Sequence, residues 1–98
     1  MLWAAWIEYT PDAAKVAEVR PKHREYEAKL LAEGKLALGG PLTDNFGALI
    51  VYEAESKEAA EELLRADPFH TSGVFVRWQL RPWKVVFSNP ALVATPAG

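Results

Sequence analysis

The stretch Lys35–Ala54, with the sequence KLALGGPLTDNFGALIVYEA, decides the fold because it holds two apolar segments around a turn. Residues 35–43 predict a strand that is bent or bulged at Gly39-Gly40-Pro41, and residues 48–54 predict a second strand. The segment between them, Asp44-Asn45-Phe46-Gly47, is rich in residues that form turns. The two strands are therefore expected to pair as a hairpin.

On the N-terminal side of this hairpin, the sequence predicts a strand and a long helix. Residues 2–9 are mostly apolar on both faces, which is typical of a central strand. Asp12 has the chemistry of a helix N-cap and Gly34 that of a helix end. Between them runs one stripe with helical spacing, formed by Val16, Val19, His23, Tyr26 and Leu30. Pro21 falls inside it, so we expect the helix to kink or restart there, with His23 in the first turn of the restarted helix.

On the C-terminal side, Ser56 predicts the N-cap of a second helix that ends near Arg65, because Pro68 forbids its continuation. Residues 73–83 predict a last long strand. Its expected faces are Val74, Val76, Trp78 and Leu80 on one side and Phe75, Arg77, Gln79 and Arg81 on the other. Residues 85–87 predict one more strand-like piece, and the Pro- and Ala-rich end predicts an extended or frayed arm. We therefore divide the chain into a domain, residues 1–87, and a C-terminal tail, residues 88–98.

The order β-α-β-β-α-β is that of the α+β ferredoxin-like motif, a four-stranded antiparallel sheet with two helices on one face. The other face of such a sheet is bare. Four tryptophans in 98 residues give this sheet a surplus of aromatic surface. Stacking the bare faces of two copies would bury that surface, so we expect a homodimer or higher homo-oligomer.

Composition excludes several classes of function. The net charge is −2 with acidic and basic residues interspersed, so no basic tract neutralises phosphates and we expect no nucleic-acid partner. No apolar stretch is long enough to cross a bilayer and no signal-peptide pattern is present, so we expect no membrane partner and a cytoplasmic location. The absence of cysteine excludes disulfides, thiolate catalysis and Cys-ligated metal centres.

The candidate site rests on His23 and Asp67, each at an expected helix end. Imidazole titrates near neutrality and a carboxylate can orient it, so the pair suits acid/base chemistry if the fold brings the two together. Two plainer interpretations stay open: a half-buried histidine bonded to a neighbour, and an ordinary turn aspartate before Pro68. A metal site of His23, Asp67 and His70 lacks a recognisable ligand spacing. We therefore expect neither a metal nor a cofactor.

Several short motifs, in order, resemble those of the YciI-like (YCII-related) family over roughly residues 2–86. They are Arg20-Pro21-x-His23-x-x-Tyr26, Gly34-Lys35-Leu36, Gly40-Pro41-Leu42, Gly47-x-Leu49, Ala66-Asp67-Pro68-Phe69 and Arg81-Pro82-Trp83. The resemblance implies a subunit of the dimeric α/β-barrel type, with His23 and Asp67 as the family's proposed His/Asp pair in a pocket. We take Gly40, Pro41 and Phe69 as candidate substrate-binding residues, since backbone left bare at Gly39-Gly40-Pro41 would serve either a strand bulge or the approach of a ligand. His70 and the tail are outside the pattern.

Three hypotheses of function follow. The first is a cofactor-independent enzyme, an isomerase or lyase, that acts on a small oxygenated or aromatic-derived molecule; His23 moves a proton and Asp67 fixes its tautomer. The second is a protein that binds a small-molecule ligand in the same pocket without chemistry. The third is a structural homo-oligomer in which the His23–Asp67 contact ties two helix ends together.

Overall fold

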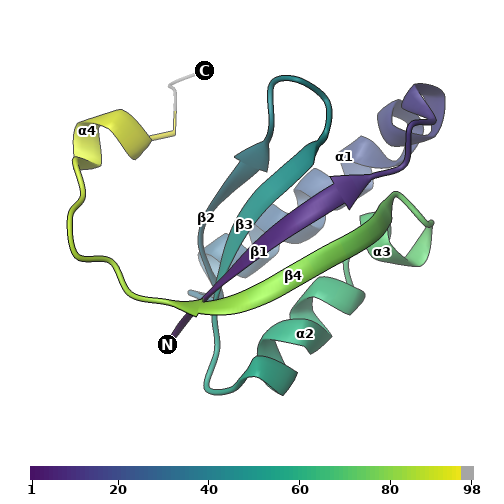
Figure 1. The fold of residues 1–98 in the computed structure, drawn as a ribbon. Coiled ribbons are helices and arrows are strands. Elements are labelled where there is room, and N and C mark those ends of the chain that lie inside the picture. Colours follow the sequence, from purple (N-terminus) through teal and green to yellow (C-terminus); the bar gives the residue numbers. More distant parts are fainter. Residues whose placement is uncertain (96–98) are drawn as a thin grey trace.

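The computed structural model describes residues 1–95 and forms one four-stranded antiparallel sheet with helices beside it (Figure 1). The strands are β1 (Leu2–Tyr9), β2 (Leu36–Pro41), β3 (Gly47–Glu53) and β4 (Phe75–Trp83), and the helices are α1 (Ala13–Ala32), α2 (Lys57–Arg65), α3 (Pro68–Thr71) and α4 (Pro90–Val93). The strand order is β2-β3-β1-β4, with β1 central as expected. Helices α1 and α2 lie on the same side of the sheet, so the α+β ferredoxin-like prediction is confirmed.

The core lies between the sheet and its helices. In β1, alternate residues Trp3, Ala5, Ile7 and Tyr9 are buried, and they pack with apolar residues of the other strands and of α1 and α2. The helices begin where the sequence places their caps: the Asp12 side chain accepts a hydrogen bond from the Lys15 amide, and that of Ser56 from the Ala59 amide. Gly34, with φ of 73°, follows the end of α1 in the left-handed region that favours glycine.

Helix α1 runs without interruption through Pro21, so the predicted restart at this residue is wrong. Proline removes one backbone donor, and the hydrogen bonds of the rest of a 20-residue helix hold it together across the gap. His23 therefore lies in the middle of α1 and not in the first turn of a new helix. The free amides and positive dipole end that a restart would supply are not beside it.

The strands contain two irregularities, one that the sequence pattern placed elsewhere and one that it did not predict. The pairing of β2 with β3 shifts between Leu36 and Leu38, so the irregularity in β2 is there and not at Gly39-Gly40-Pro41. The pairing of β1 with β4 shifts at Tyr9, which pairs with Phe75. This bulge buries Phe75 and leaves Val76 45% exposed. The strict alternation predicted for residues 74–81 therefore assigned both residues to the wrong face.

The hairpin turn between β2 and β3 depends on Gly47. A Cβ atom at this position would lie 1.7 Å from the carbonyl oxygen of Ile7 in the neighbouring strand, far inside contact distance. Asn45 in the same turn has φ of 68°, a conformation that asparagine tolerates better than most residues. The turn predicted from residues 44–47 is therefore present, with glycine required by the close approach of β1.

The C-terminal segment leaves the end of β4 and leads away from the sheet (Figure 1). Residues 85–87 form no strand, which contradicts that prediction, and Phe87 is 93% exposed. Beyond them Asn89 caps the single helical turn α4, where an extended or frayed arm was expected. Residues 96–98 of the predicted tail lie outside the described residues, and the boundary at residue 87 stays a prediction.

The four tryptophans divide between the two faces of the sheet. Trp3 and Trp78 pack with the core on the helix side. Trp6 and Trp83 lie on the open face, where they are 50% and 44% exposed. Among residues 1–95, no helix combines the length and apolar character that a membrane span needs.

Candidate active site

His23 projects from the middle of α1 towards the start of α3. Its side chain is 12% exposed, and its ring stacks on Phe69 with centroids 4.0 Å apart and an angle of 10° between the ring planes. Phe69 is itself buried, so this contact fixes the plane of the imidazole against the core. Nearby, the Tyr26 hydroxyl of α1 donates a hydrogen bond of 2.7 Å to the backbone oxygen of Leu63 in α2, which ties the two helices together.

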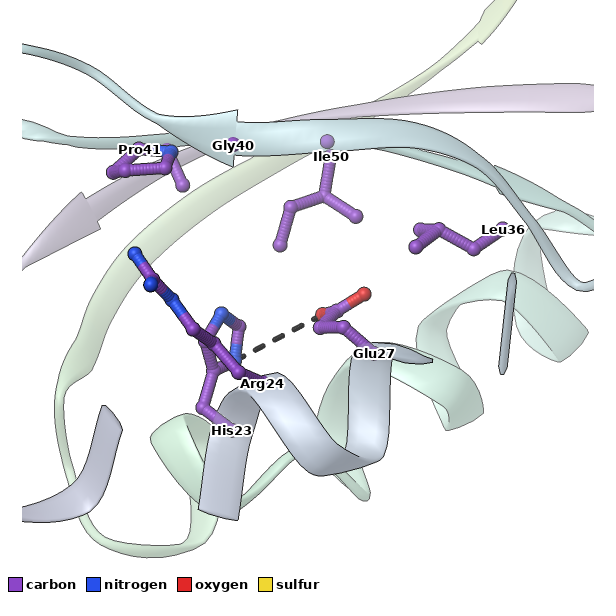
Figure 2. Close-up of a pocket in the computed structure, with 9 residues that line it drawn as sticks. His23, Arg24, Glu27, Leu36, Gly40, Pro41 and Ile50 are labelled. Carbon is purple, nitrogen blue, oxygen red and sulfur yellow. Dashed lines mark ion pairs between the residues drawn. The ribbon is translucent and has the colours of Figure 1, made fainter. Parts of the chain in front are cut away.

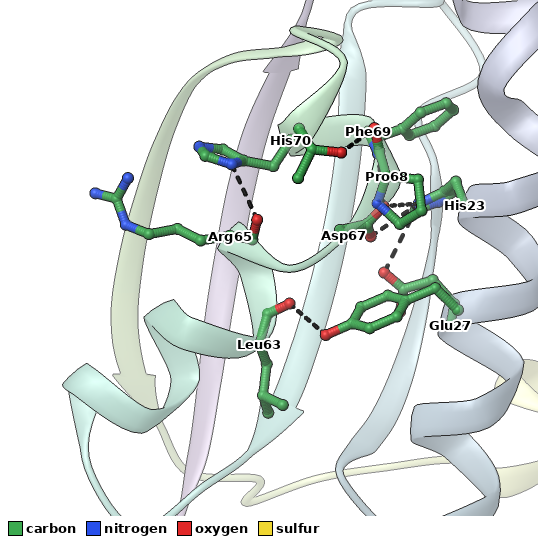
Figure 3. A network of polar contacts seen from close by, with 10 residues as sticks. His23, Glu27, Leu63, Arg65, Asp67, Pro68, Phe69 and His70 are labelled. Carbon is green, nitrogen blue, oxygen red and sulfur yellow. Dashed lines mark hydrogen bonds and ion pairs between the residues drawn. The ribbon is translucent and has the colours of Figure 1, made fainter.

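Asp67 is fully buried and meets His23 although 44 residues separate them in sequence. The Nδ1 atom of His23 lies 2.8 Å from Oδ1 and 2.9 Å from Oδ2 of Asp67. The same carboxylate caps helix α3, since Oδ1 also accepts a hydrogen bond from the Phe69 amide at 2.8 Å. Asp67 is thus both a helix cap and the partner of His23, and the two side chains that the sequence analysis paired are in contact (Figure 3).

This contact determines which nitrogen of His23 is available. A carboxylate at Asp67 accepts hydrogen bonds, so Nδ1 carries the proton and Nε2 keeps its lone pair. Figure 2 shows this second nitrogen directed towards the space between α1 and the strands. Such an imidazole can accept a proton at Nε2 while a buried carboxylate stabilises the charge that forms.

Glu27 is a third titratable group in the cluster, and the sequence analysis missed it. It follows His23 by one helical turn, its side chain is 14% exposed, and its Oε1 lies 3.9 Å from His23 Nδ1. Burial, and then the neighbouring Asp67 carboxyl, raises the pKa of Glu27 to about 9, so Glu27 is neutral near pH 7. Its position one helical turn after His23 was a weak signal, because a glutamate on a helix ordinarily belongs to a solvated face.

A pocket of about 230 Å³ opens beside this cluster, between α1 and strands β2 and β3 (Figure 2). His23, Arg24 and Glu27 line its helix side, and the strands contribute an apolar wall of Leu36, Gly39, Gly40, Pro41, Ala48 and Ile50. Gly40 and Pro41, two candidate substrate-binding residues, are therefore at the pocket. Phe69 is not among the lining residues and lies instead under the His23 ring.

The structure replaces His70 with Glu27 in the candidate metal site. His70 turns away from the pair: its Nδ1 lies 3.1 Å from the Arg65 backbone oxygen and its ring packs edge-on against Trp78. A different trio, His23, Glu27 and Asp67, places one potential ligand atom of each within 4.8 Å of the others. However, His23 Nδ1 and both Asp67 oxygens are already joined at hydrogen-bond distance. A cation would have to separate these atoms, so the cluster fits a proton better than a metal.

Comparison with known proteins places this chain in a family. The model of the YCII-related domain matches residues 1–84, and the chain belongs to this family. It is 32% identical over 96 residues to the protein YciI of Escherichia coli O6:H1 (strain CFT073), covering 84% of this chain and 98% of that protein. It is also 38% identical over 63 residues to the uncharacterized protein YjpA of Bacillus subtilis (strain 168), covering 64% of this chain and 73% of that protein.

A solved structure shares the fold. It is the 5-chloro-2-hydroxyhydroquinone dehydrochlorinase TftG of Burkholderia phenoliruptrix AC1100, in complex with 2,5-dihydroxybenzoquinone. The two structures superpose with a TM-score of 0.75 at 26% sequence identity, covering 86% of this chain and 94% of TftG. The YciI-like resemblance seen in the sequence motifs is therefore confirmed.

Proposed function

We propose that this protein is a cofactor-independent enzyme that moves protons on a small oxygenated molecule, in an elimination or an isomerisation. The observation that carries the proposal is the buried Asp67 carboxylate that holds Nδ1 of His23 while Nε2 faces the pocket. The relation to a dehydrochlorinase supports an elimination, because removal of HCl from a hydroxylated ring needs a group that accepts a proton.

Each side chain of the pair has a separate role in this proposal. Nε2 of His23 accepts a proton from a hydroxyl or an acidic C–H group of the substrate. Asp67 positions the His23 ring and stabilises the imidazolium, and the Phe69 ring stacked on the imidazole fixes the orientation of its plane. Gly40 and Pro41 form the opposite wall, with backbone close to the ligand. A positioned general base of this kind contributes about 10²- to 10⁴-fold in rate.

The substrate class follows from the pocket and the neighbour together. The pocket volume of about 230 Å³ suits a single small ring, and its strand side is apolar. TftG acts on a chlorinated hydroxyhydroquinone and holds a dihydroxybenzoquinone. We therefore propose hydroxylated rings and their quinones as the first compounds to test, with the enzyme acting in the cytoplasm.

The test compares His23→Asn with wild type on 5-chloro-2-hydroxyhydroquinone and a panel of hydroxylated aromatics. Asparagine keeps a donor near the Nδ1 position but has no Nε2, so we expect turnover to fall at least about 100-fold with little change in stability. His70→Asn is the matched control, because His70 bonds elsewhere. Equal turnover of both variants would refute the catalytic role. Ligand binding without any consumption would establish a binding protein instead.

We also propose that two copies pair through the open face of the sheet. Its exposed apolar side chains are Trp6, Phe46, Leu49, Val76 and Trp83. Exposed aromatic and aliphatic side chains on one face are costly to leave in water, and a second copy has the same surface to offer. Sedimentation should show a dimer of the wild type and a shift towards monomer for Trp6→Glu. A wild type that is monomeric at high concentration would refute this pairing.

A further inference from the structure

Glu27 lines the pocket, and after burial a side-chain hydrogen bond with the Asp67 carboxyl is the next cause of its raised pKa. Among the described residues, no N–H or hydroxyl group donates to either of its carboxyl oxygens, although both are buried. Asp67, its nearest carboxyl neighbour, already receives His23 Nδ1 on both oxygens and the Phe69 amide on one. A protonated Glu27 can therefore donate to Asp67 when no ligand is bound, and an acceptor in the pocket would compete for the same proton.

We propose that Glu27 is a neutral carboxylic acid whose O–H group turns from Asp67 to donate a hydrogen bond to a bound ligand, and that the pocket selects small rings carrying an anionic oxygen, held between Glu27 and the guanidinium of Arg24. The inference rests on the proposed function in one respect, namely that the ligand occupies the His23 pocket. It adds a third functional side chain and a charge preference, neither of which depends on the reaction.

Arg24 supports the charge preference. It precedes Glu27 by three residues on α1, a spacing at which opposite charges commonly pair. Both residues line the pocket, yet no ion pair joins them in the part of the chain that the structure describes. Figure 2 shows the Arg24 side chain extending along the pocket towards Pro41 while Glu27 points towards the strands. A neutral Glu27 leaves the guanidinium free to bind an anion, and it does not repel that anion.

The groups around Glu27 allow its proton to be followed by pH. On α1 it faces His23, Arg24 and Tyr26, and Asp67 faces it from the start of α3. Burial and then the Asp67 charge raise the pKa of Tyr26 to about 12.

Two further phenols face Glu27 from the sheet. Burial and then Asp67 raise the pKa of Tyr9 on β1 to about 12 as well, and burial and then Glu27 raise that of Tyr52 on β3. Strand β2 contributes only apolar and glycine residues to the pocket wall. The phenols therefore stay neutral while Glu27 titrates, and a comparison of wild type with a Glu27 variant at each pH isolates the effect of Glu27 together with its coupling to Asp67.

The experiment measures binding of 2,5-dihydroxybenzoquinone to wild type, Glu27→Gln and Glu27→Leu by calorimetry near pH 7. The enolic hydroxyls of this probe are vinylogous acids and supply the anionic oxygen. Glutamine is neutral and keeps a donor, so we expect Kd within about threefold of wild type. Leucine has similar volume and no donor, so we expect Kd to rise about tenfold or more, with stability equal to wild type or higher. A purely structural Glu27 would give the reverse, unchanged binding and lower stability.

The pH dependence separates this inference from the proposed function. Above about pH 9 wild type should lose affinity for the probe as Glu27 ionises, while Glu27→Gln should not. Arg24→Gln should weaken binding about tenfold or more at every pH. Equal affinity of Glu27→Leu and wild type, or no binding of the probe to wild type, would overturn the inference. Loss of turnover in His23→Asn is a separate result, since that variant is expected to bind the probe.

Discussion

Replacing Glu27 with glutamine should change how the stability of the protein depends on pH. The pKa of Glu27 is raised from 4.5 to about 9 in the folded protein, first by burial and then by Asp67. Between these two values the folded protein holds a proton that the unfolded chain has released. The free energy of unfolding of the wild type therefore falls as pH rises through this window, by up to about 1.4 kcal/mol per pH unit. Glutamine does not titrate, so the variant lacks this slope.

The magnitude follows from the width of the window. Three pH units at the full slope, from about pH 5 to about pH 8, correspond to about 4 kcal/mol. Because 14% of the Glu27 side chain stays exposed, we expect about 2–4 kcal/mol. The wild type should thus lose that much stability relative to Glu27→Gln over the interval.

Urea denaturation at several pH values checks this expectation, with the difference between wild type and variant plotted against pH. Glu25→Gln is the matched control, because Glu25 is exposed on the same helix and its replacement should leave the slope unchanged. Parallel curves for wild type and Glu27→Gln would show that Glu27 is ionised in the folded protein at neutral pH. The reasoning from burial would then be refuted.

Three further substitutions test the packing around the site. Asp67→Ala should lower the free energy of unfolding by about 3 kcal/mol, because it leaves the Phe69 amide without its cap; urea denaturation would measure this, and a loss below about 1 kcal/mol would contradict it. Gly47→Ala should lower the free energy of unfolding by more than about 3 kcal/mol, because the alanine Cβ would lie 1.7 Å from the Ile7 carbonyl oxygen. A melting temperature equal to that of the wild type would show that β1 can move aside. Gly39→Ala adds a Cβ at 3.4 Å from Ile50, an ordinary contact, so it should fold normally but narrow the pocket and weaken probe binding, as calorimetry would show.

Much of the fold was predictable because its signals are local. Asp12 and Ser56 are N-caps by their own side-chain chemistry, and the turn at residues 44–47 carries its own turn formers. The positions that failed are those where the rest of the molecule decides. Pro21 is unfavourable in an isolated helix, but α1 is long enough to continue through it. The bulge at Phe75 depends on pairing with β1, which the pattern of β4 alone does not contain.

The candidate site shows the same division. Arg20-Pro21-x-His23 and Asp67-Pro68-Phe69 could be found as motifs, and a resemblance to a family was needed to pair them across 44 residues. Glu27 could not be found in this way, because a glutamate on a helix ordinarily belongs to a solvated face. Its unusual pKa arises from burial, which only the packing of α1 against the sheet determines.

The double use of Asp67 couples the orientation of His23 to the opening of helix α3. Its Oδ1 holds both the amide at the start of α3 and the ring of His23, so a brief opening of this four-residue helix also releases the imidazole. Short helices open far more often than whole domains unfold. Hydrogen exchange at the Phe69 amide would therefore report how often the histidine can lose its orientation.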